Sequence, residues 1–237
     1  MPVSILIPVY NREGYIGACV ESALAQTVSD VEVVIVDNQS TDATWDVCQH
    51  LARQDSRIRI FQNETNLGPV RNWQRCIAEA RGTIGKLLFS DDLIAPSFLE
   101  KTLPFLDDPE VGLVTTAVDV SGKVEYQWHP GKSNSRRYLW DSMFNGRLPV
   151  SPGAALLRMK DLRQNLHNFG KHGIGPDLLL LMLTARNYPA VSHLTEPLAY
   201  FRDHPGSISS HSRVHLRRGY ALARVRFILS FVRTMQT

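Results

Sequence analysis

Short apolar runs alternate with longer amphipathic stretches along the first half of the chain. Runs rich in β-branched residues and leucine predict strands at 3–9, 31–36, 58–61 and 85–89. Between them, apolar positions recur at the spacing of a helix. Strands that alternate with helices of about 10 to 15 residues are typical of a largely parallel sheet with helices on both faces. The pattern therefore predicts an α/β, Rossmann-like fold.

The pattern is less regular in the second half of the chain. The elements expected there are a helix near 97–106, a strand at 111–117, a hairpin turn at 121–122, a strand at 124–128, a loop at 129–135, a strand at 154–157, a helix near 160–168, a helix from Pro176, and two short strands near Val191 and Leu198. We expect one domain over 1–210, with halves 1–117 and 118–210, and a basic amphipathic helix at 211–237.

The composition is that of an ordinary globular protein, because 43% of the 237 residues are hydrophobic and 21% are charged. No apolar stretch approaches the roughly 20 residues that a transmembrane helix needs. The first residues lack the basic and apolar segments of a secretory signal. Cys19, Cys48 and Cys76 lie in helix-like segments without C-x-x-C spacing. We therefore expect buried, reduced thiols and a cytoplasmic location.

The net charge of +3 comes from the end of the chain. Residues 204–237 hold six arginines and no acidic residue. A nucleic-acid-binding protein usually spreads its cationic side chains over a groove or stripe, so we expect no nucleic-acid partner. In the tail, arginines flank an apolar stripe. Such a helix can make peripheral contact with an anionic membrane surface, or it can pack against protein.

Polar residues follow the predicted strands of the first half. Tyr10 comes directly after the first strand, Asp37 ends the second, residues 63–68 follow the third, and Asp91 and Asp92 follow the fourth. In open α/β sheets, ligands bind beyond the carboxyl ends of the strands. The sequence therefore predicts one ligand site at this edge of the sheet.

Two features of this edge suggest its chemistry. Paired carboxylates such as Asp91 and Asp92 suit Mg²⁺ or Mn²⁺ bound together with substrate phosphates, although they could also simply favour the start of the following helix. Asp37 can accept a hydrogen bond from a ribose hydroxyl or a base N–H, or it can cap the next helix. G-x-G-x-x-G and P-loop motifs are absent from the sequence. These features favour a nucleotide held by side chains, with its diphosphate on a metal.

The motifs at these positions resemble those of a known family. They are S-I-L-I-P-V-Y-N at 4–11, V-V-I-V-D-N-Q-S-T-D at 33–42, N-L-G at 66–68 with R-N at 71–72, and S-D-D at 90–92. In order and spacing, this set resembles the family 2 glycosyltransferases over about residues 1–120. The resemblance implies a GT-A fold and inverting sugar transfer from a nucleotide-activated donor, with Mn²⁺ or Mg²⁺ as cofactor.

The resemblance also implies roles for residues of the donor site. Pro8, Tyr10 and Asp37 would hold the nucleobase, and Arg12 or Glu13 could border that pocket. The ribose and phosphate side would be lined by Asn66, Gly68 and Arg71. Arg202 and His204 follow an apolar segment in a motif that matches more loosely, and either side chain could close over the diphosphate.

Three aspartates would carry the chemistry. Asp91 would contact the ribose or the sugar, and Asp92 would bind the metal. Asp177 would be the general base that deprotonates the acceptor hydroxyl, as an inverting reaction requires. Many relatives have a Glu-Asp pair at that place, where this chain has Pro176 and Asp177. Asp177 could equally be an ordinary acid in the first turn of a helix.

We expect an inverting transferase that acts on a glycan or lipid-linked acceptor in polysaccharide or glycan assembly. One alternative is a sugar-nucleotide nucleotidyltransferase, which would need a glycine-rich, basic loop where residues 11–14 stand. Another is a catalytically silent nucleotide- or glycan-binding module. Trp128, Tyr138 and Trp140 could stack on an acceptor sugar, although aromatic residues more often belong to the core.

Overall fold

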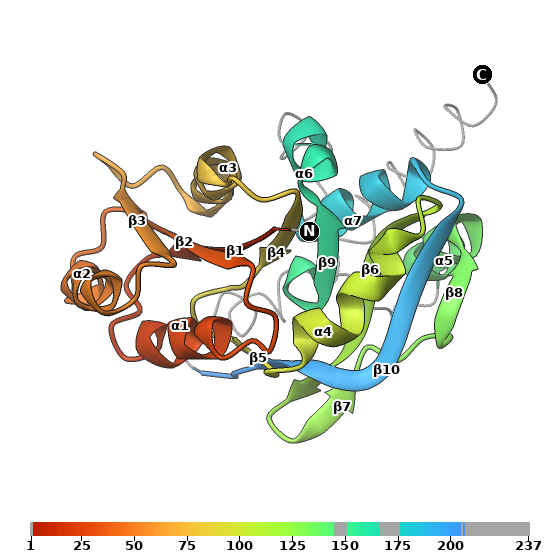
Figure 1. The fold of residues 1–237 in the computed structure, drawn as a ribbon, viewed down its shortest axis with the longest axis horizontal. Coiled ribbons are helices and arrows are strands. Elements are labelled where there is room, and N and C mark those ends of the chain that lie inside the picture. Colours follow the sequence, from red (N-terminus) through yellow and green to blue (C-terminus); the bar gives the residue numbers. More distant parts are fainter. Residues whose placement is uncertain (1, 145–150, 166–175, 205, 207–237) are drawn as a thin grey trace.

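The computed structural model describes residues 2–144, 151–165, 176–204 and 206 (Figure 1). Within these residues, the strands form one sheet. Its order is β3 (Ile58–Gln62), β2 (Val31–Asp37), β1 (Val3–Val9), β4 (Ile84–Leu87), β9 (Ala155–Arg158), β6 (Val111–Val120), β10 (Ala190–Phe201) and β5 (Leu93–Ile94). Two further strands, β7 (Lys123–Glu125) and β8 (Gly131–Asn134), pair with β6 and β10. The expected helix at 211–237 lies outside the described residues.

The first half of the sheet is parallel, as the sequence predicts. β1 pairs with β2 and β4, and β2 pairs with β3. In this register Val9 lies opposite Asp37, and Asp37 lies opposite Gln62. The carboxyl ends of these strands therefore meet at one edge, where the polar residues were expected to gather.

The second half of the sheet is mixed. β9 is antiparallel to both β4 and β6, whereas β6 and β10 are parallel. The expected loop at 129–135 is wrong because it contains β8, an edge strand that pairs through its backbone and needs no apolar side chains. The two short strands expected near Val191 and Leu198 are one strand, β10, with register shifts around Pro197. Proline lacks the N–H that a regular ladder requires.

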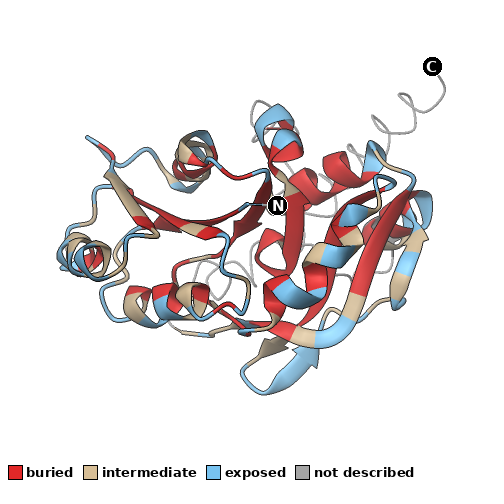
Figure 2. Cartoon of the chain, viewed as in Figure 1, coloured by how far each residue is buried: buried red, intermediate tan, exposed pale blue. Residues whose placement is uncertain are grey.

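Helices cover both faces of the sheet. One face carries α1 (Ile16–Leu24), α2 (Thr44–Gln54), α4 (Phe98–Thr102) and the 3₁₀ helix η1 (Leu103–Asp107). The other carries α3 (Pro69–Glu79), α5 (Ser135–Phe144), α6 (Met159–Asn165) and α7 (Pro176–Arg186). A second short 3₁₀ helix, η2 (Pro152–Ala154), precedes β9. Each layer packs an apolar cluster against the sheet, so burial is concentrated on the strands (Figure 2). The expected α/β fold is confirmed.

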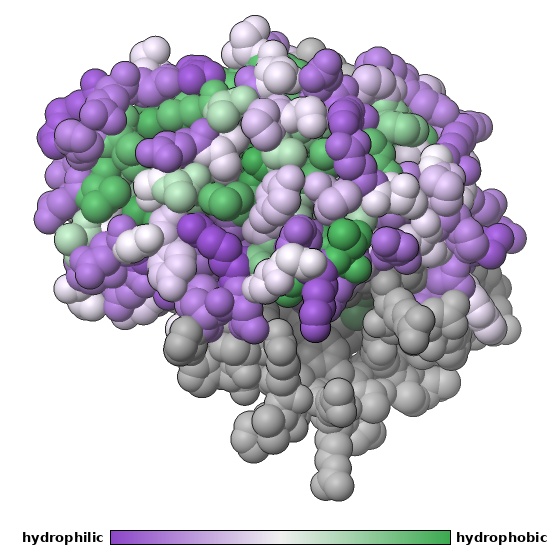
Figure 3. Space-filling view, turned by 90° about the horizontal axis from the view of Figure 1, so that it is seen from below, coloured by the Kyte–Doolittle hydropathy of each residue, from purple (hydrophilic) through white to green (hydrophobic). Residues whose placement is uncertain are grey.

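The state of the cysteines and the character of the surface fit a protein with a single apolar core on each face of the sheet. Cys19, Cys48 and Cys76 are buried and free, which confirms the expected state of the thiols. No helix of the described residues combines the length and the apolar character of a membrane span. Hydrophobic and hydrophilic residues are interspersed on the face drawn in Figure 3.

Candidate active site

The base end of the site lies where β1 and β2 finish. Pro8 is buried within β1, whereas Tyr10 is 39% exposed at the rim. Asp37 is fully buried. Its carboxylate accepts hydrogen bonds from the amide and hydroxyl of Ser40 and from Nε2 of Gln62, the last at 3.0 Å. At this end of the site the Tyr10 side chain is therefore exposed, whereas the Asp37 carboxylate is buried.

A network of asparagines supports this end. Asn63 Nδ2 donates to Asn38 and Asn72 at 2.9 Å each. Asn72 Nδ2 in turn donates to the carbonyl of Val36 at 3.0 Å, and Asn38 Nδ2 donates to Asn66 at 2.8 Å. The network ties the ends of β2 and β3 to α3 without any charged group.

The loop before α3 continues the rim. Gly68 has a φ of +79°, in the left-handed region that favours glycine. Its amide donates to Asn66 Oδ1 at 2.9 Å, which fixes the turn into the helix. Arg71 lies exposed in the first turn of α3. The structure thus brings these three predicted residues to the same edge as Asp37.

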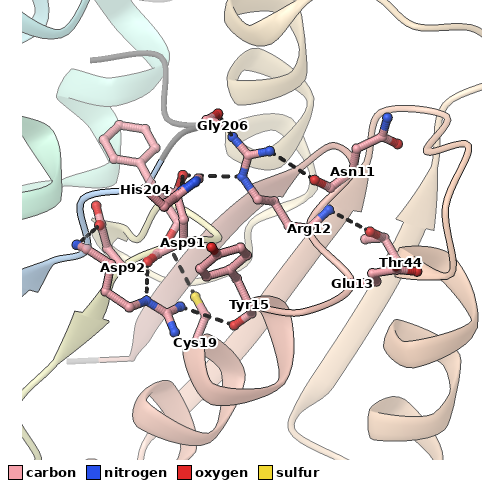
Figure 4. Close-up of polar contacts among 12 residues, drawn as sticks. Asn11, Arg12, Glu13, Tyr15, Cys19, Thr44, Asp91, Asp92, His204 and Gly206 are labelled. Carbon is pink, nitrogen blue, oxygen red and sulfur yellow. Dashed lines mark hydrogen bonds and ion pairs between the residues drawn. The ribbon is translucent and has the colours of Figure 1, made fainter. Parts of the chain in front are cut away.

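Arg12 and Glu13 belong to the loop between β1 and α1. The Glu13 carboxylate accepts the amide of Ala43 at 2.8 Å, at the start of α2. The amide of Arg12 donates to Thr44 Oγ1 at 2.7 Å. Glu13 is therefore engaged in fastening the loop to α2, while the side chain of Arg12 turns toward Asp91 (Figure 4).

Asp91 lies between two cationic or titratable side chains (Figure 4). Its Oδ2 atom is 3.2 Å from Arg12 Nε and 3.0 Å from His204 Nε2. His204 stacks on Tyr15, with ring centroids 4.5 Å apart. Arg12 also donates to the carbonyl of Gly206 at 2.9 Å. Residues near the start and the end of the described chain therefore meet around one carboxylate.

Arg202 holds the segment after β10 in place through hydrogen bonds. Its Nε donates to the carbonyl of Asp91, and a terminal nitrogen donates to the carbonyl of Tyr15 at 3.2 Å. The guanidinium lies over the Tyr15 ring, 5.0 Å from its centroid. The amide of Arg202 donates to Asp92 Oδ1 at 3.2 Å. Arg202 therefore positions both aspartates and the turn that carries His204.

Asp92 is more deeply buried than Asp91. It is 8% exposed, and burial, reinforced by the charge of Asp91, raises the pKa of Asp92 to about 7. Lys86, fully buried in β4, interacts with it electrostatically. Burial lowers the pKa of Lys86 to about 7. Its ammonium lies 4.3 Å from the Phe98 ring centroid and donates to the carbonyl of Gly153.

Asp177 lies in the first turn of α7. Its Oδ1 atom is buried and has no hydrogen-bond partner within the described part of the chain. Burial raises the pKa of Asp177. A carboxylate with a raised pKa and an unused oxygen is suited to accept a proton. Among the described residues, no direct contact links Asp177 to the cluster around Asp91.

Several site residues were not predicted. Tyr15 supports His204 and Arg202 from α1's side, and no sequence pattern marks it. Lys86 had a signal, because it is a lysine inside an otherwise apolar strand. Asn72 also had a sequence signal, because it lies four residues before Cys76 and so falls on the same, buried face of α3.

The expected aromatic contacts to an acceptor are only partly compatible with the structure. Tyr138 is fully buried in the core, so its suggested stacking role is wrong. Trp128 is half-buried, and its indole donates to Asp141 at 2.9 Å. Trp140 is 61% exposed.

A divalent cation fits the donor set at the rim. Asp91 and Asp92 offer carboxylate oxygens, and His204 offers a ring nitrogen next to Asp91. Within the described residues, no group of three acidic, histidine or cysteine side chains forms a metal cage. Mg²⁺ and Mn²⁺ need none, because they take one or two carboxylates together with water and substrate phosphates.

The chain is similar to several proteins of known sequence or structure. EpsH of Bacillus subtilis is 40% identical over 102 residues, which are 43% of this chain and 29% of that protein. The structure of S. aureus TarS 1–349 with UDP-GlcNAc superposes with a TM-score of 0.77 and 24% identity, covering 95% of this chain and 66% of TarS 1–349. A mannosyltransferase from Pyrobaculum calidifontis, solved with GDP-Man and Mn²⁺, gives 0.63 and 18%, covering 98% and 64%.

These matches differ in what they establish. At 24% and 18% identity, the two structures show the fold alone, which is GT-A. The chain spans less than a third of EpsH in the matched region and about two thirds of each solved structure. The model of the family described as "Glycosyl transferase family 2" matches residues 4–166, well over half of the chain. The chain belongs to the family 2 glycosyltransferases.

Proposed function

We propose that the protein is an inverting transferase that moves a sugar from a nucleoside diphosphate to a hydroxyl of a glycan or lipid-linked acceptor. The observation that carries this proposal is the position of Asp91. In a member of this family, it lies at the carboxyl edge of the sheet, between Arg12 and His204. A donor diphosphate at this edge would meet two cationic or titratable groups and a carboxylate that can share a metal.

The base end would hold the nucleoside. Tyr10 supplies an exposed ring, and Asp37 supplies a carboxylate whose position Ser40 and Gln62 fix. The Asn66–Gly68 turn and Arg71 would follow the ribose and the phosphates. The complexes of TarS with UDP-GlcNAc and of the archaeal mannosyltransferase with GDP-Man support a nucleotide-sugar donor. They leave uridine and guanosine donors as the first to test.

Asp91 and Asp92 would hold a divalent cation, which would neutralise the charge that develops on the departing diphosphate. The sequence assigned this role to Asp92. The geometry adds Asp91, because its side chain is 19% exposed, while the buried Asp92 already accepts a backbone amide through Oδ1. We expect Asp91 to take the larger share, with His204 beside it.

Asp177 would act as the general base. In the displacement, the acceptor oxygen forms a bond to the anomeric carbon while the bond from that carbon to the diphosphate breaks. The hydroxyl proton passes to Asp177, whose pKa burial raises. The diphosphate leaves with the electron pair of the broken bond. Transfer in one displacement inverts the anomeric configuration, which NMR spectroscopy of the product detects.

Calorimetry would test the donor site first. UDP, GDP and dTDP are titrated into the protein with and without Mn²⁺, and we expect one of them to bind in a metal-dependent manner. Asp91→Asn should lose more metal-dependent affinity than Asp92→Asn. The opposite order would return the main metal contact to Asp92. If no nucleoside diphosphate binds, the proposed function is wrong.

Turnover would test the chemistry. With the matching donor, Asp91→Asn should lower the release of nucleoside diphosphate by about 10²- to 10³-fold, because transition-state charge is left unbalanced. Asp177→Asn should keep nucleotide affinity and lose transfer. Asp108→Asn is the matched control, since Asp107 and Asp108 are an adjacent acid pair away from the rim. Equal activity in Asp91→Asn, Asp177→Asn and the control would contradict the assignment.

A further inference from the structure

Four partly exposed aromatic side chains continue the rim beyond Asp91. They are Trp73 of α3, Phe89 two residues beyond β4, Phe201 at the end of β10 and Tyr126 directly after β7. The ring centroids of Trp73 and Phe89 are 5.1 Å apart, and those of Phe201 and Tyr126 are 6.3 Å apart. We call these four rings the aromatic row.

Gly153 joins the two pairs of rings. A Cβ atom at this position would lie 3.1 Å from Phe201 and 3.3 Å from Phe89, so both rings pack against the bare backbone of η2. The carbonyl of Gly153 accepts the buried ammonium of Lys86. This bond fixes η2 to β4, and the row therefore rests on a rigid part of the fold.

The backbone of Tyr126 is unusual. Its φ of +59° lies in the left-handed region. This conformation is unfavourable for any residue that has a Cβ atom, and more so for a bulky one. The conformation directs the chain after β7 so that the Tyr126 ring meets the edge of Phe201.

The order of strands gives the row a direction. The base end lies at β1 and β2, and the cluster around Asp91 lies at the end of β4. β9, β6 and β10 follow on the side of β4 away from the base. A nucleoside diphosphate sugar with its base at Asp37 and its diphosphate at Asp91 would therefore bring its sugar to Phe89. Phe201 and Tyr126 lie on the side of Phe89 away from the base, across Gly153.

We propose that Phe201 and Tyr126 form the acceptor subsite and stack on the apolar C–H face of a pyranose ring. The proposal rests on the proposed function. Aromatic rings offer large apolar surfaces at low conformational cost, and a pyranose exposes carbon-bound hydrogens on its faces and hydroxyls around its edge. Stacking would thus fix the plane of the acceptor and leave its hydroxyls free to approach the donor.

The test uses four simple probes, the methyl β-pyranosides of glucose, galactose, mannose and N-acetylglucosamine. Saturation-transfer NMR records their binding to the protein loaded with its nucleoside diphosphate and Mn²⁺. We expect at least one probe to bind through its C–H protons. Phe201→Leu and Tyr126→Asn should each weaken that binding by about five- to tenfold, while nucleotide affinity stays unchanged. Asparagine is chosen because it tolerates a positive φ.

Trp140→Leu is the matched control, because Trp140 is the most exposed large aromatic of the described chain and lies on α5, which packs on the opposite face of the sheet from Phe201 and Tyr126. Weaker binding in this variant alone would overturn the proposal in favour of α5. Wild-type probe binding in both row variants would also overturn it. So would a loaded protein that binds none of the probes.

Failure of the proposed function would look different, because the protein would then bind no nucleoside diphosphate. Thermal melting identifies a variant that does not fold. If Phe201→Leu is such a variant, Tyr126→Asn decides the outcome, since the Tyr126 side chain lies at the surface end of the row and follows the exposed strand β7.

Discussion

The two halves of the sheet edge are built by different means. At the ends of β1, β2 and β3, uncharged amides hold one another and the backbone. At the end of β4, Asp91 and Asp92 interact with arginines, a histidine and a buried lysine that come mainly from elsewhere in the chain. The amide network of the first half should therefore depend little on pH. The second half carries the charged and titratable side chains that the proposed reaction would use.

A buried histidine in the second half extends this contrast and gives the largest expected effect. Burial lowers the pKa of His193 to about 4. The imidazole is neutral because Nε2 accepts the amide of Trp128 at 3.2 Å and Nδ1 lies 2.9 Å from Thr115 Oγ1. The unfolded chain binds a proton at about pH 6.5. Between these values it binds more protons than the folded protein, so stability falls as pH falls.

The loss should reach about 3 kcal/mol near pH 4, from the difference between the two pKa values. Urea unfolding at a series of pH values measures it. His193→Gln should flatten the profile between pH 6.5 and 4, because glutamine has no proton to take up. His50→Gln, which changes an exposed histidine on α2, should keep the wild-type slope. Equal slopes in all three proteins would contradict the role of His193.

Loss of one amide tests the first half. Asn72→Ala should lower the free energy of unfolding by about 2 kcal/mol, because the carbonyl of Val36 and the amide of Asn63 lose their partner in a buried place. The loss should be the same at pH 6 and pH 8, since no group in the network titrates there. Gln54→Ala removes an exposed amide and should change stability little. A strongly pH-dependent loss would show that the two halves are coupled.

Local patterns account for what could be predicted. Asp37 ends β2 and Asp91 lies four residues beyond the end of β4, so the alternation of strands and helices sufficed to place both at one edge. The support of Arg202 by Tyr15 joins residues 187 positions apart, and no periodicity reports such a contact. β8 was missed because its polar residues have loop composition, and only pairing with β10 makes them a strand. The acids were thus predictable, and the groups that position them were not.

An ion pair at the surface of the second half should have the smallest effect. Lys101 of α4 lies 2.6 Å from Glu196 of β10, but the two side chains are 40% and 50% exposed. Water screens such pairs, so we expect a coupling of about 0.5 kcal/mol or less in a double-mutant cycle with Lys101→Ala and Glu196→Ala. Salt at about 1 M should abolish it, because the Debye length then falls to about 3 Å. A coupling several times larger that persists in salt would mean that surface charge helps to hold β10 against α4. If the coupling is small, the position of β10 depends on its ladder with β6 and on the hydrogen bonds of Arg202.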